Sequence, residues 1–176
     1  MADRVERNLP LLCLIRAMQM ALFPMAILSV FLQREIGFGV ADIMLLQGVF
    51  GLAMVLFEFP SGYLADRIGY RRSLILAFAL WTVAWPIYGH AHGWLGVASA
   101  ELLLGIGMSL ISGCDTALLY ESLLAGKREH EFTRWAGRLT FSGQVAEGLA
   151  ALAAGLLFAT AVALPFWAQG VASAVA

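Results

Sequence analysis

GYLADRIGYRR, residues 62–72, is a short stretch with four charged side chains between two long apolar runs. The run before it extends from about residue 40, and the run after it begins at residue 73. A charged segment that contains glycine, in such a place, is typical of a tight turn between two membrane helices. The stretch therefore predicts two helices joined by a turn that lies in water at one membrane surface.

The composition of the whole chain also points to a membrane. Hydrophobic residues make up 61% of the 176 residues and charged residues only 13%, whereas an average soluble domain carries about 25% charged residues. A bilayer core needs roughly 20 apolar residues per helix, so the chain has room for five or six spans. The net charge is −1 and the basic residues are dispersed, which argues against a nucleic-acid partner. We expect an all-α, polytopic membrane helix bundle surrounded by membrane lipid.

Charged residues, glycines and prolines divide the chain into five full predicted spans and a truncated sixth. Pro165 favours a turn within the long uncharged run after Glu147, because proline ends or kinks a helix. The sixth apolar run reaches Ala176 without a basic flank, so we expect residues 1–176 to be an incomplete N-terminal transmembrane domain. The predicted helices cover residues 9–32, 40–65, 73–90, 94–124, 136–158 and 164–176.

The basic residues predict an orientation. Nine of the eleven precede the first helix, lie in the stretch 62–72, or lie between residues 127 and 138. In the predicted topology these three regions are on one side of the membrane. Because cytoplasmic loops retain an excess of Lys and Arg, we expect that side, with the N-terminus, to be cytoplasmic.

Polar side chains inside the predicted spans are candidates for a substrate cavity or for proton coupling, because a charge in lipid is costly and faces the bundle interior or water. The helices predicted at 73–90 and 164–176 carry no charge, so we expect these two to face lipid and the other four to face the interior. The candidate residues are Arg16, Gln19, Glu58, Glu101, Asp115, Glu121, Gln144 and Glu147.

Some of these candidates belong to stripes of polar and small residues on one helix face, such as Glu101, Gly105 and Asp115. The small members are as consistent with close helix packing as with function, whereas for Asp115 and Glu147 we favour function. Arg16 and Glu58 are predicted at matching depths and form the first candidate ion pair, with a structural and a gating role both open. Pro24 should bend the first helix.

Four short stretches carry a family resemblance. The stretch 62–72 closely resembles the loop between helices 2 and 3 of the major facilitator superfamily, usually GxLADRxGRR or a lysine variant of it, with Tyr70 in place of a basic residue. FEFPSG, residues 57–62, and SGCDTALLYESL, residues 112–123, resemble further motifs of bacterial members. ALPFW, residues 163–167, looks like their link between helices 5 and 6.

The resemblance implies a secondary transporter of twelve helices in two halves, with a small-molecule substrate bound between them and access alternating as the halves rock. We expect efflux or proton-coupled transport in a bacterial inner membrane, with the C-terminal half outside these residues as the partner. The stretch 62–72 would then latch one half against the other. The implied latch residues are Gly62, Asp66, Arg67, Gly69, Arg71 and Arg72.

Other classes of function are less well supported by the sequence. The alternative is a membrane-embedded helical module that does not transport and acts through self-association or a partner. The spacing of nucleophiles, bases and metal ligands does not suggest an enzyme. We therefore expect no cofactor, no metal site and no catalytic activity.

Overall fold

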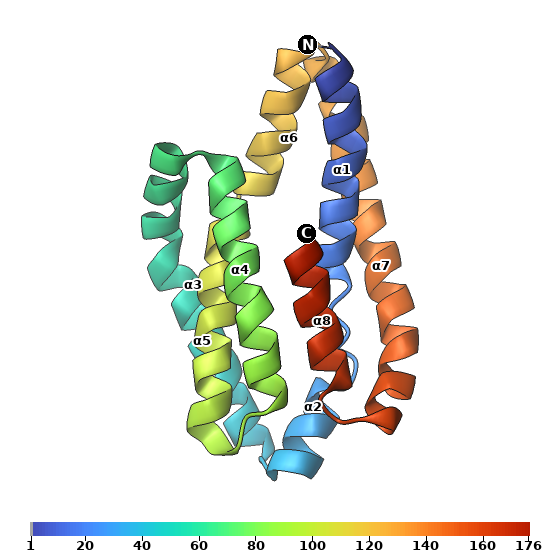
Figure 1. Cartoon of the computed structure of the whole chain (residues 1–176). Coiled ribbons are helices and arrows are strands. Elements are labelled where there is room, and N and C mark those ends of the chain that lie inside the picture. The colour runs from blue at the N-terminus through green and yellow to red at the C-terminus, as the bar shows by residue number, and fades with distance from the viewer. Residues whose placement is uncertain (1) are drawn as a thin grey trace.

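The computed structural model describes residues 2–176, with side chains from residue 8 onward, and every regular element in that range is a helix. Figure 1 shows these helices as a bundle in which most of the long axes run along one direction. The elements are α1 (Ala2–Met20), α2 (Leu28–Phe31), the π-helix η1 (Leu32–Ile36), α3 (Val40–Ile68), α4 (Tyr70–Gly89), α5 (Gly93–Ile111), α6 (Cys114–Ala125), the 3₁₀-helix η2 (Glu129–Glu131), α7 (Phe132–Thr160) and α8 (Leu164–Val175).

The helices form two groups in space. On one side α5 packs against both α3 and α4, and α8 packs against the other face of α4. On the other side α1 packs along α7, and α6 contacts α1 and α7 near the end where the N-terminus lies (Figure 1). Phe31, Tyr88 and Phe166 fill the core between α2, α4 and α8, with the rings of Tyr88 and Phe166 stacked at a centroid distance of 5.5 Å.

Within residues 2–176, four helical stretches are long and apolar enough to cross a bilayer. They are Val40–Ile68, Tyr70–Gly89, Gly93–Ala125 and Glu129–Thr160. The predicted count of five full spans and a truncated sixth is therefore not confirmed.

The predicted N-terminal helix over residues 9–32 is not continuous. The helix α1 ends at Met20, and the chain unwinds over residues 21–27 before α2 begins. Leu22 takes a positive φ of 44°, and Pro24 has no backbone N–H to continue the helical hydrogen bonds. Proline thus marks a break in this helix, where the sequence predicted only a bend.

Glycine sets two further boundaries. The predicted helix 94–124 is divided into α5 and α6 at Gly113, which takes a φ of 82°. In the charged stretch 62–72 only Gly69, with a φ of 88°, lies outside the helices α3 and α4. Both values belong to the left-handed region that residues with a β-carbon rarely adopt. The stretch 62–72 therefore consists of the charged end of α3 and the charged start of α4, joined at one glycine. It contains no extended loop.

Burial does not follow the charge pattern from which we expected the uncharged helix at residues 73–90 to face lipid. Buried residues make up 44% of the apolar window of α4 but only 11% of that of α3. The buried face of α4 includes Trp81, Ala84, Trp85 and Tyr88. An apolar helix surface packs equally well against lipid tails and against another helix. The absence of charge therefore could not distinguish the two environments.

Candidate binding cavity and intramembrane ion pair

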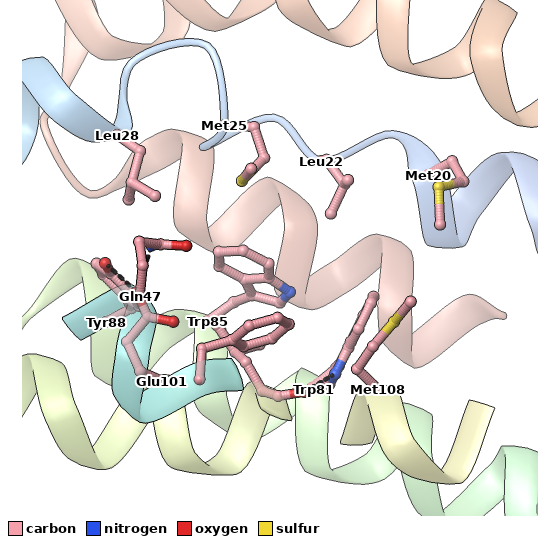
Figure 2. Close-up of a pocket in the computed structure, with 12 residues that line it drawn as sticks. Met20, Leu22, Met25, Leu28, Gln47, Trp81, Trp85, Tyr88, Glu101 and Met108 are labelled. Atoms are coloured by element: carbon pink, nitrogen blue, oxygen red, sulfur yellow. Dashed lines mark hydrogen bonds between the residues drawn. The ribbon is translucent and has the colours of Figure 1, made fainter. Parts of the chain in front are cut away.

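A cavity of about 190 Å³ lies between the unwound segment of the N-terminal region and the helices α3, α4 and α5. Figure 2 shows the unwound segment on one side and the side chains of α3, α4 and α5 on the other. The wall is mainly apolar. We call this space the Glu101 cavity; its lining residues are Met20, Leu22, Met25, Leu28, Gln47, Phe50, Trp81, Trp85, Tyr88, Glu101, Leu104 and Met108.

Glu101, on α5, is the acidic residue of the cavity and is only 3% exposed. The hydroxyl of Tyr88 donates a hydrogen bond of 2.9 Å to its Oε1. The amide of Gln47 donates to the same oxygen at 3.3 Å. Both partners are neutral, and Glu101 forms no ion pair with any residue whose side chain the structure describes. The carboxyl group of Glu101 is thus held by hydrogen bonds, but no described side chain supplies a positive charge to compensate a negative one.

The aromatic wall comes from one face of α4, where Trp81, Trp85 and Tyr88 are spaced at i, i+4 and i+7. The indole N–H of Trp81 donates to the carbonyl of Leu104 at 3.1 Å. The indole N–H of Trp85 is buried and has no acceptor among the described residues. A buried donor without an acceptor is costly and needs an explanation.

Gln169, on α8, supports the unwound segment that closes one side of the cavity. Its Oε1 accepts a hydrogen bond of 3.4 Å from the backbone N–H of Phe23. Its Nε2 donates to the carbonyls of Met18 and Gln19 at 3.3 and 3.4 Å. Non-helical backbone at membrane depth is tolerated where protein groups satisfy it. This fully buried amide therefore replaces part of the hydrogen bonding that the break in the helix removes.

The second polar centre is an ion pair between α1 and α6. Arg16 Nη1 lies 3.0 Å from Asp115 Oδ2 and 3.1 Å from Gln19 Oε1. The predicted pairing of Arg16 with Glu58 is wrong, because α1 packs against α6 and α7 while Glu58 is exposed on α3. Matching depth could not identify the partner, since it says nothing about which helices are neighbours.

The remaining predicted cavity residues stay apart from both centres. Glu121 is exposed on α6. Gln144 and Glu147 are exposed on α7, on the same face as Thr140, Ala151 and Gly155. The small residue Gly105, by contrast, has a packing role: a β-carbon there would lie 2.7 Å from the carbonyl oxygen of Phe50 on α3.

The predicted latch residues lie at the adjoining ends of α3 and α4. Gly62, Asp66, Arg67, Gly69, Arg71 and Arg72 are all exposed. The guanidinium of Arg67 lies over the ring of Tyr63, 5.0 Å from its centroid. In the part of the chain whose side chains are described, neither Asp66 nor the three arginines take part in an ion pair.

In the link between α6 and α7, some charged side chains pair with one another. Arg128 donates to both carboxylate oxygens of Glu131, at 2.6 and 2.9 Å. The indole N–H of Trp135 donates a further hydrogen bond of 3.3 Å to Oε2 of Glu131. The charges of this basic link are thus partly paired within the chain, whereas those of the stretch 62–72 are not.

Sequence reasoning missed Trp85, Tyr88 and Gln169. The spacing of Trp81, Trp85 and Tyr88 on one helix face was a visible signal. It was not used, because that helix carries no charge and was expected to face lipid. The role of Gln169 had no signal, because it depends on the break in α1. Across the described residues, no group of three or more His, Cys, Asp and Glu side chains could hold a metal ion.

Long apolar helices define this chain as an integral, multi-pass membrane protein. The family model of the Major Facilitator Superfamily matches residues 11–176, and the chain belongs to this superfamily. Its members transport small solutes across membranes and are not enzymes. A search of curated proteins finds no match.

Proposed function

We propose that this chain is the N-terminal half of a secondary transporter that moves a small molecule by alternating access against a second, related half. Membership of the superfamily supports membrane transport. The exposed polar face of α7 is the observation that supports an arrangement of two halves. The charges at the α3–α4 junction add a second line of support.

The polar face of α7 is suited to a water-filled path or to another part of the transporter. Gln144 and Glu147 are exposed there and form no hydrogen bond with any described side chain. Polar side chains that face lipid are costly, so such residues normally face a bundle interior or a cavity. We propose that this face lines the path between the two halves.

The α3–α4 junction is suited to a latch because its charges do not stabilise the helices that carry them. Asp66 lies in the last turn of α3, where the helix dipole disfavours an anion. Arg71 and Arg72 lie in the first turn of α4, where it disfavours cations. Without ion pairs inside the described chain, these groups are free to bind opposite charges on the second half.

We extend the proposal to proton-coupled export from the cytoplasm of a bacterial cell across its inner membrane. Glu101 is a carboxylate in a membrane-spanning segment, where a proton can compensate its charge. A carboxylate that holds either a proton or a solute group links the two movements in opposite directions. Proton entry would then drive solute exit.

The experiment is a transport assay on the intact protein in its membrane. Cells that express it are screened for lowered accumulation of radiolabelled and fluorescent small solutes, with and without a protonophore. For any solute identified, Asp66→Asn should reduce export at least tenfold with unchanged amounts of protein in the membrane. The matched control is Glu35→Gln, which removes an exposed carboxylate of η1; η1 directly follows α2, which lies at the other end of the bundle (Figure 1).

Two results would contradict the proposal. Export that is unchanged in Asp66→Asn removes the latch role. If export continues after the protonophore has abolished the proton gradient, while the gradients of other solutes are intact, then export is not coupled to protons.

A further inference from the structure

We propose that the Glu101 cavity binds a small organic cation that carries a quaternary ammonium group and an oxygen acceptor. This inference goes beyond the transport proposal, because it assigns a ligand chemistry to the cavity around Glu101, which that proposal leaves open. It rests on four features of the cavity: its carboxylate, its aromatic wall, its unpaired indole donor and its size.

The carboxylate calls for a positive charge. Glu101 is 3% exposed, and its hydrogen-bond partners, Tyr88 and Gln47, are neutral donors to a single oxygen. Among the described side chains no donor binds Oε2. Arg16, on α1, is already engaged with Asp115. A buried anion without a counter-ion is strongly unfavourable, so whenever Glu101 does not hold a proton a bound cation is the natural complement of this site.

The wall around the carboxylate is suited to an ammonium group with an apolar surface. Trp81, Trp85 and Tyr88 present aromatic rings from one face of α4 (Figure 2). Aromatic faces attract cations most strongly where water is excluded, and quaternary ammonium ligands are bound by such aromatic cages. Met25 and Met108 add flexible, polarisable side chains that adapt to the methyl groups of a ligand.

The indole N–H of Trp85 points to a second feature of the ligand. It is buried, lines the cavity and has no acceptor among the described residues. An oxygen on the bound molecule would accept this hydrogen bond and remove the cost of the unpaired donor. The site thus provides for a cationic end near Glu101 and an oxygen near Trp85.

The size of the cavity limits the ligand. An engineered apolar cavity of about 150 Å³ holds one benzene molecule, and the volume here is about 190 Å³. A single ammonium group with a short oxygen-bearing arm fits this space, whereas a cation with several fused rings does not. Met25 is half-exposed at the unwound segment, which borders the cavity on that side.

The test measures binding of choline to the intact protein in nanodiscs by isothermal titration calorimetry. Choline has the required ammonium and hydroxyl groups, and 3,3-dimethylbutan-1-ol is its neutral counterpart of nearly the same shape. We expect choline to bind at least tenfold more tightly than the neutral alcohol. Failure of choline to bind, or equal affinity for both molecules, would overturn the proposal.

Two variants assign the binding to this cavity. Glu101→Gln keeps the shape of the side chain and should weaken choline binding at least tenfold while leaving the alcohol unaffected. Trp85→Phe keeps an aromatic ring but removes the donor, and should weaken choline binding about threefold to tenfold. The matched controls are Glu35→Gln and Trp167→Phe, because both side chains are exposed away from the cavity. Unchanged choline affinity in both cavity variants would contradict the assignment.

The outcome is separable from that of the transport proposal. Choline binding that depends on Glu101 supports the cavity site even where Asp66→Asn leaves export unchanged. Conversely, export that depends on Asp66 says nothing in favour of this cavity if choline fails to bind.

Discussion

The two sides of this molecule treat polar groups in different ways. On the cavity side, formed by α3, α4, α5 and α8, the polar groups of Glu101 and Gln169 are buried and held by neutral hydrogen-bond partners. On the α1–α7 side, formed by α1, α6 and α7, Arg16 and Asp115 form a partly exposed ion pair, and Glu147 is exposed. Polar residues within the spans thus have distinct environments, set by the neighbouring helices.

The difference teaches where a substitution should matter for stability and where it should matter for function. In a close-packed region an added methyl group or an unpaired donor has no space or water to relieve it. On an exposed face the same change is tolerated by the folded state. The following three experiments test this contrast, and each pairs a residue in a defined contact with a control outside it.

The largest effect is expected from Gly105→Ala on the cavity side. The added β-carbon would lie 2.7 Å from the carbonyl oxygen of Phe50 and 2.8 Å from the β-carbon of Ala53, so α3 and α5 must separate. We expect a loss of about 1–3 kcal/mol in the free energy of unfolding, typical of overpacking. Reversible unfolding of the intact protein in mixed detergent micelles measures the change.

The control for this experiment is Gly155→Ala on the exposed face of α7. A β-carbon there meets no atom within 4 Å. Alanine is the better helix former, so stability should rise slightly, by less than about 1 kcal/mol. Equal losses in the two variants would contradict the contrast between the two sides.

Gln169→Leu should have the next largest effect. It removes the side-chain bonds to the Phe23 N–H and to the carbonyls of Met18 and Gln19, which are 3.3–3.4 Å long. We expect a loss of about 1–2 kcal/mol and faster amide hydrogen exchange over residues 21–27. Gln33→Leu, at an exposed position of η1, should leave both quantities unchanged. If exchange in residues 21–27 is the same in Gln169→Leu and in wild type, the support from Gln169 is wrong.

The smallest effect is expected for the ion pair on the α1–α7 side. Arg16 and Asp115 are 26% and 24% exposed, so solvent screens part of their attraction. A double-mutant cycle with Arg16→Gln and Asp115→Asn should give a coupling energy of about 1 kcal/mol.

The rejected partner provides the control for this cycle. Combining Arg16→Gln with Glu58→Gln should give additive changes in stability, because the two residues are not in contact. A coupling energy with Glu58 that equals or exceeds the coupling with Asp115 would restore the pairing expected from the sequence.

Much of the fold could be predicted because its signals are local. The boundaries of α3, α4, α7 and α8 lie within a few residues of those expected, since hydropathy and charge vary along the chain as the membrane requires. The division of the helix predicted at 94–124 was missed because one glycine adopts a backbone conformation that hydropathy does not reveal. The family resemblance, carried by short motifs, is confirmed by the match over residues 11–176.

The candidate sites were less predictable. The sequence identified Arg16, Glu101 and Asp115 as unusual, because ionisable groups are rare in apolar runs. It gave the wrong partner for Arg16 and none for Glu101. Exposure alone separates Glu101 from Glu147, although both lie on stripes of the same kind.

The sequence by itself determined that this is a helical membrane protein of the Major Facilitator Superfamily, with most of its charges near the helix ends and a few within the apolar runs. Only the tertiary structure decided that α1 breaks over residues 21–27, that Gln169 satisfies the break, and that Tyr88 and Gln47 bind Glu101. The physical reason is that the cost of a charge in lipid depends on residue type, whereas its compensation depends on which helices are adjacent. Adjacency between apolar surfaces has no signature along the chain, because lipid and protein solvate them equally well.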